Sequence, residues 1–169
     1  GLPAIVVNPT FMIGPYDVKP SSGKLLLYGI GKKILFYPPG GKNFVHILDV
    51  CHGIANAIDK GKPGECYLLA NQNMSYKEFF SMVNRIRGAS AIMIQIPTFI
   101  LRLAGLLGSL QQRILRKAGK LNYTTAYLLC LQTYYSGKKS QRELAITYTP
   151  IEQAVHQALD WFKENNYCK

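Results

Sequence analysis

Short apolar runs rich in β-branched residues alternate along the chain with longer amphipathic stretches. The runs predict strands, and the stretches predict helices. The expected strands are residues 4–7 (AIVV), 34–37 (ILFY), 44–47 (FVHI), 66–70 (CYLLA) and 92–96 (IMIQI), with a PPGG turn between the second and the third. The first run lies between prolines and lacks polar alternation, which is typical of a strand buried on both faces of a sheet.

Helical spacing of apolar residues predicts five helices, three of which begin at a recognisable capping residue. The expected helices are 49–60, 75–86, 98–117, 123–132 and 149–162. Asp49 is expected to cap the first helix. Ser75 and Glu78 have the spacing of a capping box, as do Thr149 and Glu152 at the last helix.

Strands that alternate with helices indicate an α/β protein, and 169 residues are enough for one domain with a real core. The buried strands are too few, however, to form a parallel sheet with both faces covered. The sequence therefore predicts an incomplete architecture, in which the strand at 4–7 needs neighbours that this chain does not contain.

The chain is strongly basic, with 20 lysines and arginines against nine acidic residues and a net charge of +11. This balance is compatible with a nucleic acid, an anionic membrane surface or a phosphate-bearing ligand, or with an acidic remainder of the protein outside this chain. The basic residues are scattered and no zinc-finger or RNP-type motif accompanies them. A nucleic-acid partner is therefore not expected.

The cysteines and histidines show no metal-ligand spacing. Cys51, Cys66, Cys130 and Cys168 are far apart and form no CxxC pair, which predicts reduced thiols, mostly packing residues, in a cytoplasmic protein. His46, His52 and His156 form no HxxxH or HExxH pattern, so no metal site is expected, and His46 is interpreted as structural. No apolar run reaches the roughly 18–20 residues of a membrane span.

Residues 97–120 form a basic amphipathic stretch. Leu103, Leu106, Leu107, Leu110 and Ile114 make an apolar stripe, and arginines and lysines lie elsewhere on the helix. A stripe of this kind packs against a core or covers a pocket, which is the favoured interpretation, or it lies in a membrane interface.

The order of three motifs resembles the C-terminal half of extended short-chain dehydrogenases/reductases, in particular their dihydroflavonol-reductase-like branch. The motifs are VVNPTFMIGPYDVKPSSG (6–23), PGGKNFVHILDVCHGIANAIDKGKPGECYLLANQNMSYKEFF (39–80), and KKSQREL with YTPIEQAVHQALDWFKENNY (138–144 and 148–167). The resemblance covers nearly the whole chain and is weakest between about residues 90 and 130.

The resemblance implies that residues 1–169 are the substrate-binding part of a Rossmann-like enzyme that uses NAD or NADP. The partners that the family implies are the N-terminal Rossmann half, a small carbonyl or alcohol substrate and a second copy in a homodimer. Asn8, Pro9 and Thr10 match a segment beside the nicotinamide, and Ser21 and Ser22 match a position near the cofactor phosphates. Phe11, Met12 and Lys42 are the substrate-contacting positions that it implies.

The family's Gly-rich cofactor loop and catalytic YxxxK pair lie upstream of its equivalent of the strand at 4–7. The YxxxK matches in this chain, at Tyr28, Tyr134 and Tyr135, lie downstream and are interpreted as coincidental. The chain is therefore expected to be inactive by itself and to bind no cofactor tightly.

An alternative within the same superfamily is a nucleotide-sugar epimerase or dehydratase. Lys42 lies where those enzymes have a phosphate-binding arginine, but lysine lacks the bidentate fork. Their second arginine is expected in an RPGD-like stretch, where this chain has YYSG at 134–137. This departure favours a neutral carbonyl substrate. A stand-alone basic module that binds a membrane surface is the remaining alternative.

Overall fold

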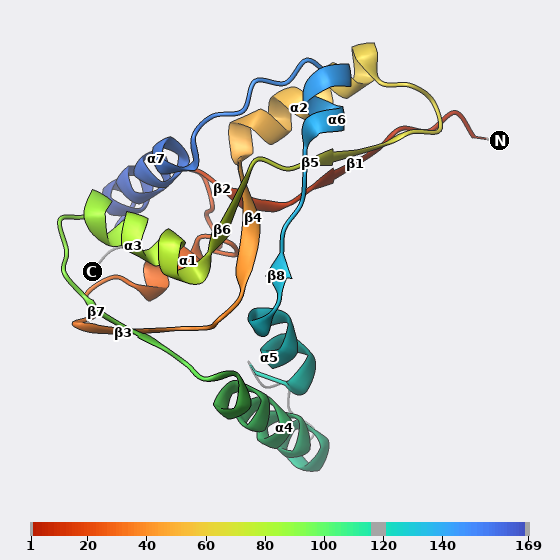
Figure 1. Ribbon diagram of the computed structural model, residues 1–169. Helices are drawn as coiled ribbons and strands as arrows, with labels where there is room; N and C mark the ends of the chain where they lie inside the picture. The colour runs from red at the N-terminus through yellow and green to blue at the C-terminus, as the bar shows by residue number, and fades with distance from the viewer. Residues whose placement is uncertain (1, 116–120, 168–169) are drawn as a thin grey trace. The chain divides into compact units, whose positions relative to one another are not determined.

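The computed structural model describes residues 2–115 and 121–167, apart from the side chains of residues 114 and 115 (Figure 1). The chain divides into two compact units. Unit 1 comprises residues 1–31, 43–73 and 134–169, and unit 2 comprises residues 32–42 and 74–133. The mixed α/β class that the sequence predicts is confirmed.

Unit 1 contains two parallel strand pairs. Strand β1 (Val6–Pro9) pairs with β5 (Cys66–Leu69), and β2 (Phe11–Ile13) pairs with the second part of β4 (Gly41–His46). The helices of this unit are α1 (Lys24–Tyr28), α2 (Ile47–Lys60), α6 (Lys138–Glu143) and α7 (Ile151–Glu164).

Side chains from strands and helices form the core of unit 1. Its buried members are Val45, Val50, Ala57, Tyr67, Leu69, Leu144 and Ile146. Helix α7 buries every apolar residue that its spacing predicts for the core, at 151, 155, 158, 159 and 162. Burial of this apolar face is what holds an amphipathic helix against a domain.

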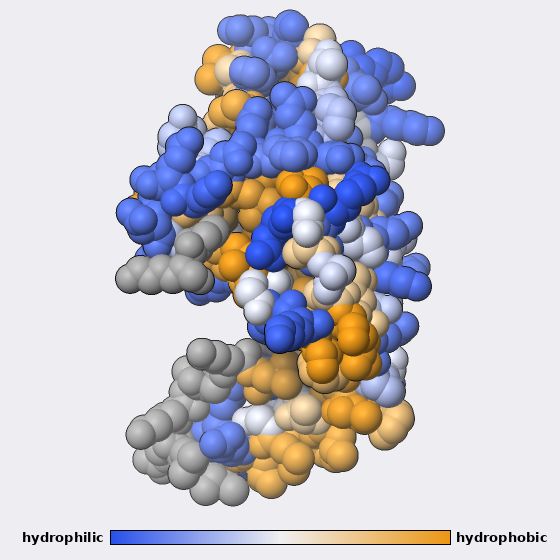
Figure 2. Space-filling model, turned by 90° about the vertical axis from the view of Figure 1, so that its left-hand side faces the viewer, coloured by the Kyte–Doolittle hydropathy of each residue, from blue (hydrophilic) through white to orange (hydrophobic). Residues whose placement is uncertain are grey.

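Unit 2 is built from two further strand pairs and three helices. Strand β3 (Ile34–Tyr37) pairs in parallel with β7 (Ile92–Gln95), and the start of β4 pairs with β8 (Gln132–Thr133). The helices are α3 (Tyr76–Ile86), α4 (Thr98–Leu115) and α5 (Tyr123–Cys130). Strand β6 (Gln72–Ser75) leads into α3. Figure 2 shows hydrophobic surface gathered over α4 and α5.

Most predicted elements are present, and the capping box of α3 is confirmed. Ser75 Oγ accepts from Glu78 N at 3.2 Å, and Glu78 Oε2 accepts from Ser75 N at 2.7 Å. The strands predicted at 34–37 and 44–47 exist, but the turn between them does not pair them, since they belong to different sheets.

The predicted roles of Asp49 and Thr149 as helix caps are wrong. His46 is the N-cap residue of α2, and Asp49 lies inside the first turn, where it is buried. The N-cap position of α7 is Pro150, with no side-chain cap; the Thr149 hydroxyl donates instead to Asp49 Oδ1 at 2.8 Å, and the Thr149 amide donates to Asp49 Oδ2 at 2.7 Å. Asp49 and Thr149 therefore bond to each other, whereas the sequence predicted that each would cap its own helix.

The first strand, whose sequence is typical of burial on both faces, has one exposed face in this chain. In β1, Val6 is 49% exposed and Asn8 and Pro9 are exposed as well. Ile5 and Val7 point to the other face and pack against the core of unit 1, and among the described residues β1 pairs with β5.

Ile54 and Ile58, which follow the helical spacing of α2, are 48% and 79% exposed. Cys51 and Cys66 are exposed thiols rather than packing residues, and Cys168 lies outside the described residues. None of the described helices is long and apolar enough to cross a membrane.

Candidate cofactor and substrate pocket

A hollow of about 270 Å³ opens in unit 1 where the chain leaves β2 and where α2 begins. Three residues that the sequence singles out, Met12, Ser21 and Ser22, line it. The other lining residues are Gly14, Pro15, Tyr16, Asp17, Ile47, Leu48 and Cys51. The hollow thus combines an apolar wall with three residues that have hydroxyls, one with a carboxylate and one with a thiol.

Asp17 organises the loop that carries the two serines. Its carboxylate accepts hydrogen bonds from the backbone amides of Ser21, at 2.9 Å, and Gly23, at 2.8 Å. Ser21 Oγ lies 3.5 Å from the same carboxylate. A Cβ at Gly23 would collide with the ring of Phe162 on α7, so only glycine allows the loop to approach this helix.

The hydrogen bonds to Asp17 limit which groups of the serine loop can donate to an anion. The amides of Ser21 and Gly23, which would suit phosphate oxygens, already donate to a carboxylate. The Ser21 hydroxyl also donates to Asp17 Oδ1, at 3.5 Å, so Ser22 Oγ is the donor that a phosphate could use beside the hollow without displacing that bond. Asp17 was not predicted from the sequence, although an aspartate four residues before Ser-Ser-Gly is a recognisable loop-closing signal.

The segment at residues 8–10 lies at the carboxyl end of β1. Asn8 Nδ2 donates to Cys66 Sγ at 3.0 Å, across the β1–β5 pair. Thr10 Oγ1 lies 2.8 Å from Asn43 Oδ1 and 3.2 Å from the carbonyl of Leu69. Pro9 is exposed. These residues are not among those that line the hollow.

Asn43 is a buried polar centre that was not predicted from the sequence. It is 2% exposed, and its Oδ1 accepts from Thr10 Oγ1 and from the amide of Asn71 at 3.0 Å. Its Nδ2 donates to Asn73 Oδ1 at 2.6 Å and to the carbonyl of Tyr135 at 3.3 Å. Asn43 therefore fixes Thr10 relative to the segment that leads to α6.

The three implied substrate positions differ in their surroundings. Met12 lines the hollow, whereas the ring of Phe11 packs edge-on against Phe44, with the ring centres 5.5 Å apart. Lys42 belongs to unit 2, opposite Thr133 in the β4–β8 pair. Burial lowers the pKa of the Lys42 ammonium from its usual value.

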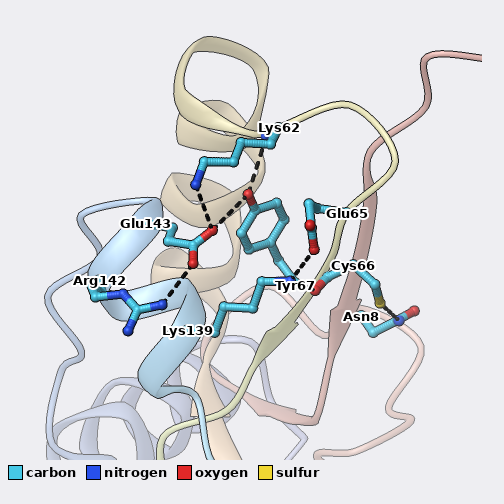
Figure 3. Close-up of polar contacts among 8 residues, drawn as sticks. All are labelled: Asn8, Lys62, Glu65, Cys66, Tyr67, Lys139, Arg142 and Glu143. Atoms are coloured by element: carbon cyan, nitrogen blue, oxygen red, sulfur yellow. Dashed lines mark hydrogen bonds and ion pairs between the residues drawn. The ribbon is translucent and has the colours of Figure 1, made fainter.

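The YxxxK matches do not form tyrosine–lysine pairs on a continuous helix. Helix α1 ends at Tyr28, and Gly31 has a φ of 73°, so no helical turn joins Tyr28 to Lys32. Lys139 Nζ instead donates to Glu65 Oε2 at 2.6 Å and to the carbonyl of Cys66 at 3.0 Å (Figure 3).

The contacts around Lys139 attach α6 to β5. The ammonium lies 4.8 Å from the ring centre of Tyr67, and Tyr67 Oη donates to Glu143 Oε2 at 3.3 Å (Figure 3). The hydrogen bond to Glu65 raises the pKa of Lys139, and the hydrogen bond from Arg142 lowers the pKa of Glu143. This network is a structural one.

His46 is buried beside α7, and its Nδ1 has no hydrogen-bond partner in the described part of the chain. Its Nε2 lies 2.9 Å from Gln157 Oε1 of α7. Its Nδ1 lies 3.9 Å from Asp49 Oδ1. Among the described residues, no group of three or more histidine, cysteine, aspartate or glutamate side chains is placed to hold a metal ion.

Comparison with known proteins gives relatives along the whole chain, although no family model matches it. A putative dihydroflavonol 4-reductase from Synechocystis is 27% identical over all of this chain and 51% of its own length. Sterol demethylase protein B from Methylococcus capsulatus is 29% identical over 97% of this chain and 51% of its own length. The crystal structure of gox2253 superposes with a TM-score of 0.81, at 30% identity, over 99% of this chain and 51% of that one.

The chain is homologous to the C-terminal half of extended short-chain dehydrogenases/reductases. It spans about half the length of the curated relatives that it matches. A nucleoside-diphosphate-sugar epimerase from Pseudomonas aeruginosa has the same fold, with a TM-score of 0.80 at 23% identity. The Rossmann-like fold class of the extended dehydrogenases/reductases is thereby confirmed for this chain.

Proposed function

We propose that this chain is the substrate-binding portion of an NAD(P)-dependent oxidoreductase that moves a hydride between a nicotinamide and a carbonyl or alcohol carbon. The observation that carries the proposal is the relationship, over the full length of the chain, to the C-terminal half of dihydroflavonol-reductase-like proteins. The hollow beside Met12, Ser21 and Ser22 supports it, because it lies where open α/β sheets bind ligands, at the carboxyl end of parallel strands.

The residues of the hollow fit one part of a dinucleotide rather than a whole one. Its volume, about 270 Å³, is below the roughly 300–1,000 Å³ of complete ligand pockets. The hydroxyls of Ser21 and Ser22 would donate to a phosphate oxygen, and Asp17 would hold the Ser21 backbone in place while they do so. The bound nicotinamide would provide the hydride chemistry.

The residues near the end of β1 would form one side of the nicotinamide site. Asn43 holds the Thr10 hydroxyl at 2.8 Å, which leaves a rigid strand end for a planar ring to lie against. Met12 would contact substrate from the wall of the hollow, and Phe11 would support that wall through Phe44. The proposed substrate role of Lys42, a residue of unit 2, rests on the resemblance alone.

A bulky, mostly apolar substrate fits the relatives better than a charged one. The names of the curated relatives refer to a dihydroflavonol, a sterol and, for a ketoreductase from Stigmatella aurantiaca, a farnesyl-bearing quinoline oxide. The apolar share of the wall of the hollow, formed by Met12, Pro15, Ile47 and Leu48, is consistent with such a substrate.

The experiment is a cofactor-dependent assay of the protein expressed from its natural reading frame. Oxidation of NADH and NADPH is followed with a dihydroflavonol, a 3-oxosteroid and a nucleotide sugar as separate substrates. Turnover of an apolar ketone is expected. Ser22→Ala is expected to raise the cofactor KM roughly three- to tenfold, as for loss of one hydrogen bond to a charged group, while Ser90→Ala, on an exposed loop, leaves it unchanged.

One outcome would contradict the proposed reductase activity, and another would contradict only the proposed role of the serine loop. Conversion of the nucleotide sugar alone would replace the reductase with an epimerase or dehydratase. An unchanged cofactor KM in Ser22→Ala, with turnover intact, would remove the serine loop from the cofactor site without touching the reductase assignment.

A further inference from the structure

The positive charge of this protein is concentrated in one of its two units. Unit 2 contains eleven lysines and arginines and a single acidic residue, Glu78, whereas unit 1 contains nine basic and eight acidic residues. Unit 2 therefore accounts for nearly all of the net charge of +11. Three of its basic residues, Arg116, Lys117 and Lys120, lie outside the described residues.

One face of α4 in unit 2 is fully used for packing against α5. Leu101, Gly105 and Gly108 form this face, at the three- and four-residue spacing of a helix stripe. A Cβ at Gly105 would lie 2.5 Å from the Cβ of Ala126, and a Cβ at Gly108 would collide with the carbonyl of Leu121. The two glycines let the helices approach closely and fix which face of α4 is turned away from α5.

The opposite face of α4 is a broad apolar stripe that the described residues leave open. Its members are Phe99, Leu103, Leu106, Leu107 and Leu110, each between 54% and 70% exposed. At 100° per residue, these positions fall within an arc of about 100°. Figure 2 shows the hydrophobic surface that α4 and α5 present. Five large apolar side chains in one arc exceed the scattered exposure that is normal for a protein surface.

Arginine and tyrosine side chains border the stripe. Arg102 and Arg113 are exposed and lie on the same flank of α4, and the Arg102 guanidinium is 5.7 Å from the ring centre of Tyr127 on α5. Tyr123 and Leu128 of α5 are about half exposed as well. An apolar arc with arginines on its flank and tyrosines at its edge is the pattern of a helix that lies in a membrane interface.

We propose that α4, with the adjoining face of α5, attaches this protein to the surface of an anionic phospholipid membrane. The two observations act together. An apolar stripe inserts among acyl chains, and a strongly basic unit is attracted to acidic headgroups, so attachment has the two signals that stable interfacial binding needs. A nucleic acid would use the charge but leave the apolar stripe in water.

The attachment is independent of the proposed oxidoreductase activity, and its test does not need turnover. The protein expressed from its natural reading frame is sedimented with phosphatidylcholine vesicles and with vesicles that also contain roughly one-third phosphatidylserine. Co-sedimentation with the anionic vesicles is expected, with weaker binding to the neutral ones and a loss of binding as salt is raised.

Matched variants test whether vesicle binding depends on the apolar stripe of α4 or on any exposed apolar side chains. Leu103→Gln/Leu107→Gln is expected to weaken binding to anionic vesicles roughly tenfold or more, since two large side chains no longer enter the acyl region. The control, Ile54→Gln/Ile58→Gln, alters two exposed isoleucines of α2 with the same spacing and is expected to bind as the unchanged protein does. Circular dichroism establishes that both variants are folded.

Three results would overturn the proposal. The first is folded protein that stays in the supernatant with anionic vesicles. The second is equal vesicle binding by the Leu103/Leu107 variant and the unchanged protein; if that variant also loses turnover of an apolar ketone, the stripe belongs to the substrate pocket. The third is tight, salt-sensitive binding to duplex DNA that the leucine changes leave intact, together with weak vesicle binding, which would assign the basic unit to nucleic acid.

Discussion

Asp49 joins α2 to the segment that precedes α7, 100 residues further along the chain. Its buried carboxylate accepts from both the amide and the hydroxyl of Thr149, two residues before α7 begins. Two hydrogen bonds to one carboxylate are among the stronger ones in proteins, and both donors lose their partner if the carboxylate is removed.

Asp49→Ala is therefore expected to lower the free energy of unfolding by about 3 kcal/mol, because Thr149 would keep two unsatisfied donors. Urea denaturation followed by circular dichroism measures this change. Asp59→Ala, an exposed aspartate on the same helix, is the matched control and should change stability by less than about 0.5 kcal/mol. Equal effects in the two variants would contradict the role assigned to the Asp49–Thr149 pair.

The first turn of α3 is held by its own sequence, through the reciprocal bonds between Ser75 and Glu78. The backbone and side-chain hydrogen bonds from Ser75 lower the pKa of Glu78 from its usual value of 4.5. A carboxyl whose pKa is lower in the folded state stabilises the fold above the unfolded pKa, and that contribution is lost as the pH falls through the folded pKa.

Ser75→Ala is expected to cost about 1 kcal/mol of stability at neutral pH. The difference between the variant and the unchanged protein should narrow as the pH falls below 4.5, where Glu78 begins to protonate. Urea unfolding at a series of pH values measures this stability difference, with Ser90→Ala as the control. A difference that stays constant with pH would show that Glu78 takes no part in the cap.

At the scale of the whole molecule, β1 has the composition of a buried strand, but one of its faces is exposed. Val6 is about half exposed, although its β-branched segment has the composition of a buried strand. This mismatch supports the proposal that further polypeptide, of the kind found in the other half of its relatives, pairs along β1 in the functioning enzyme.

The 169-residue chain by itself is expected to give no NADH- or NADPH-dependent turnover and only weak cofactor affinity. The hollow in unit 1 is too small for a whole dinucleotide, and the tyrosine–lysine matches among the described residues belong to other contacts or to a broken helix. Isothermal titration with NADPH and a ketone assay on the purified chain measure both properties. Cofactor-dependent turnover by the pure chain would contradict the prediction.

Local sequence determined the elements that depend on near neighbours. The apolar spacing from Ile151 to Phe162 defined α7 and its buried face, and Ser75 with Glu78 defined the start of α3. These features follow from hydrogen bonds and side-chain contacts within one or two helical turns. The order of the motifs along the chain was likewise enough to indicate the family.

Tertiary structure alone decided which groups meet across long separations. Asp49 and Thr149 each have a residue type that suits a local cap, but they bond to each other, because a buried carboxylate gains more from two donors than either helix end gains from a cap. Asn43 as a polar centre could not be found from the sequence, and the sequence showed the apolar stripe of α4 but not that it is exposed. Each depends on where distant segments pack, and periodicity along the chain carries no information about that.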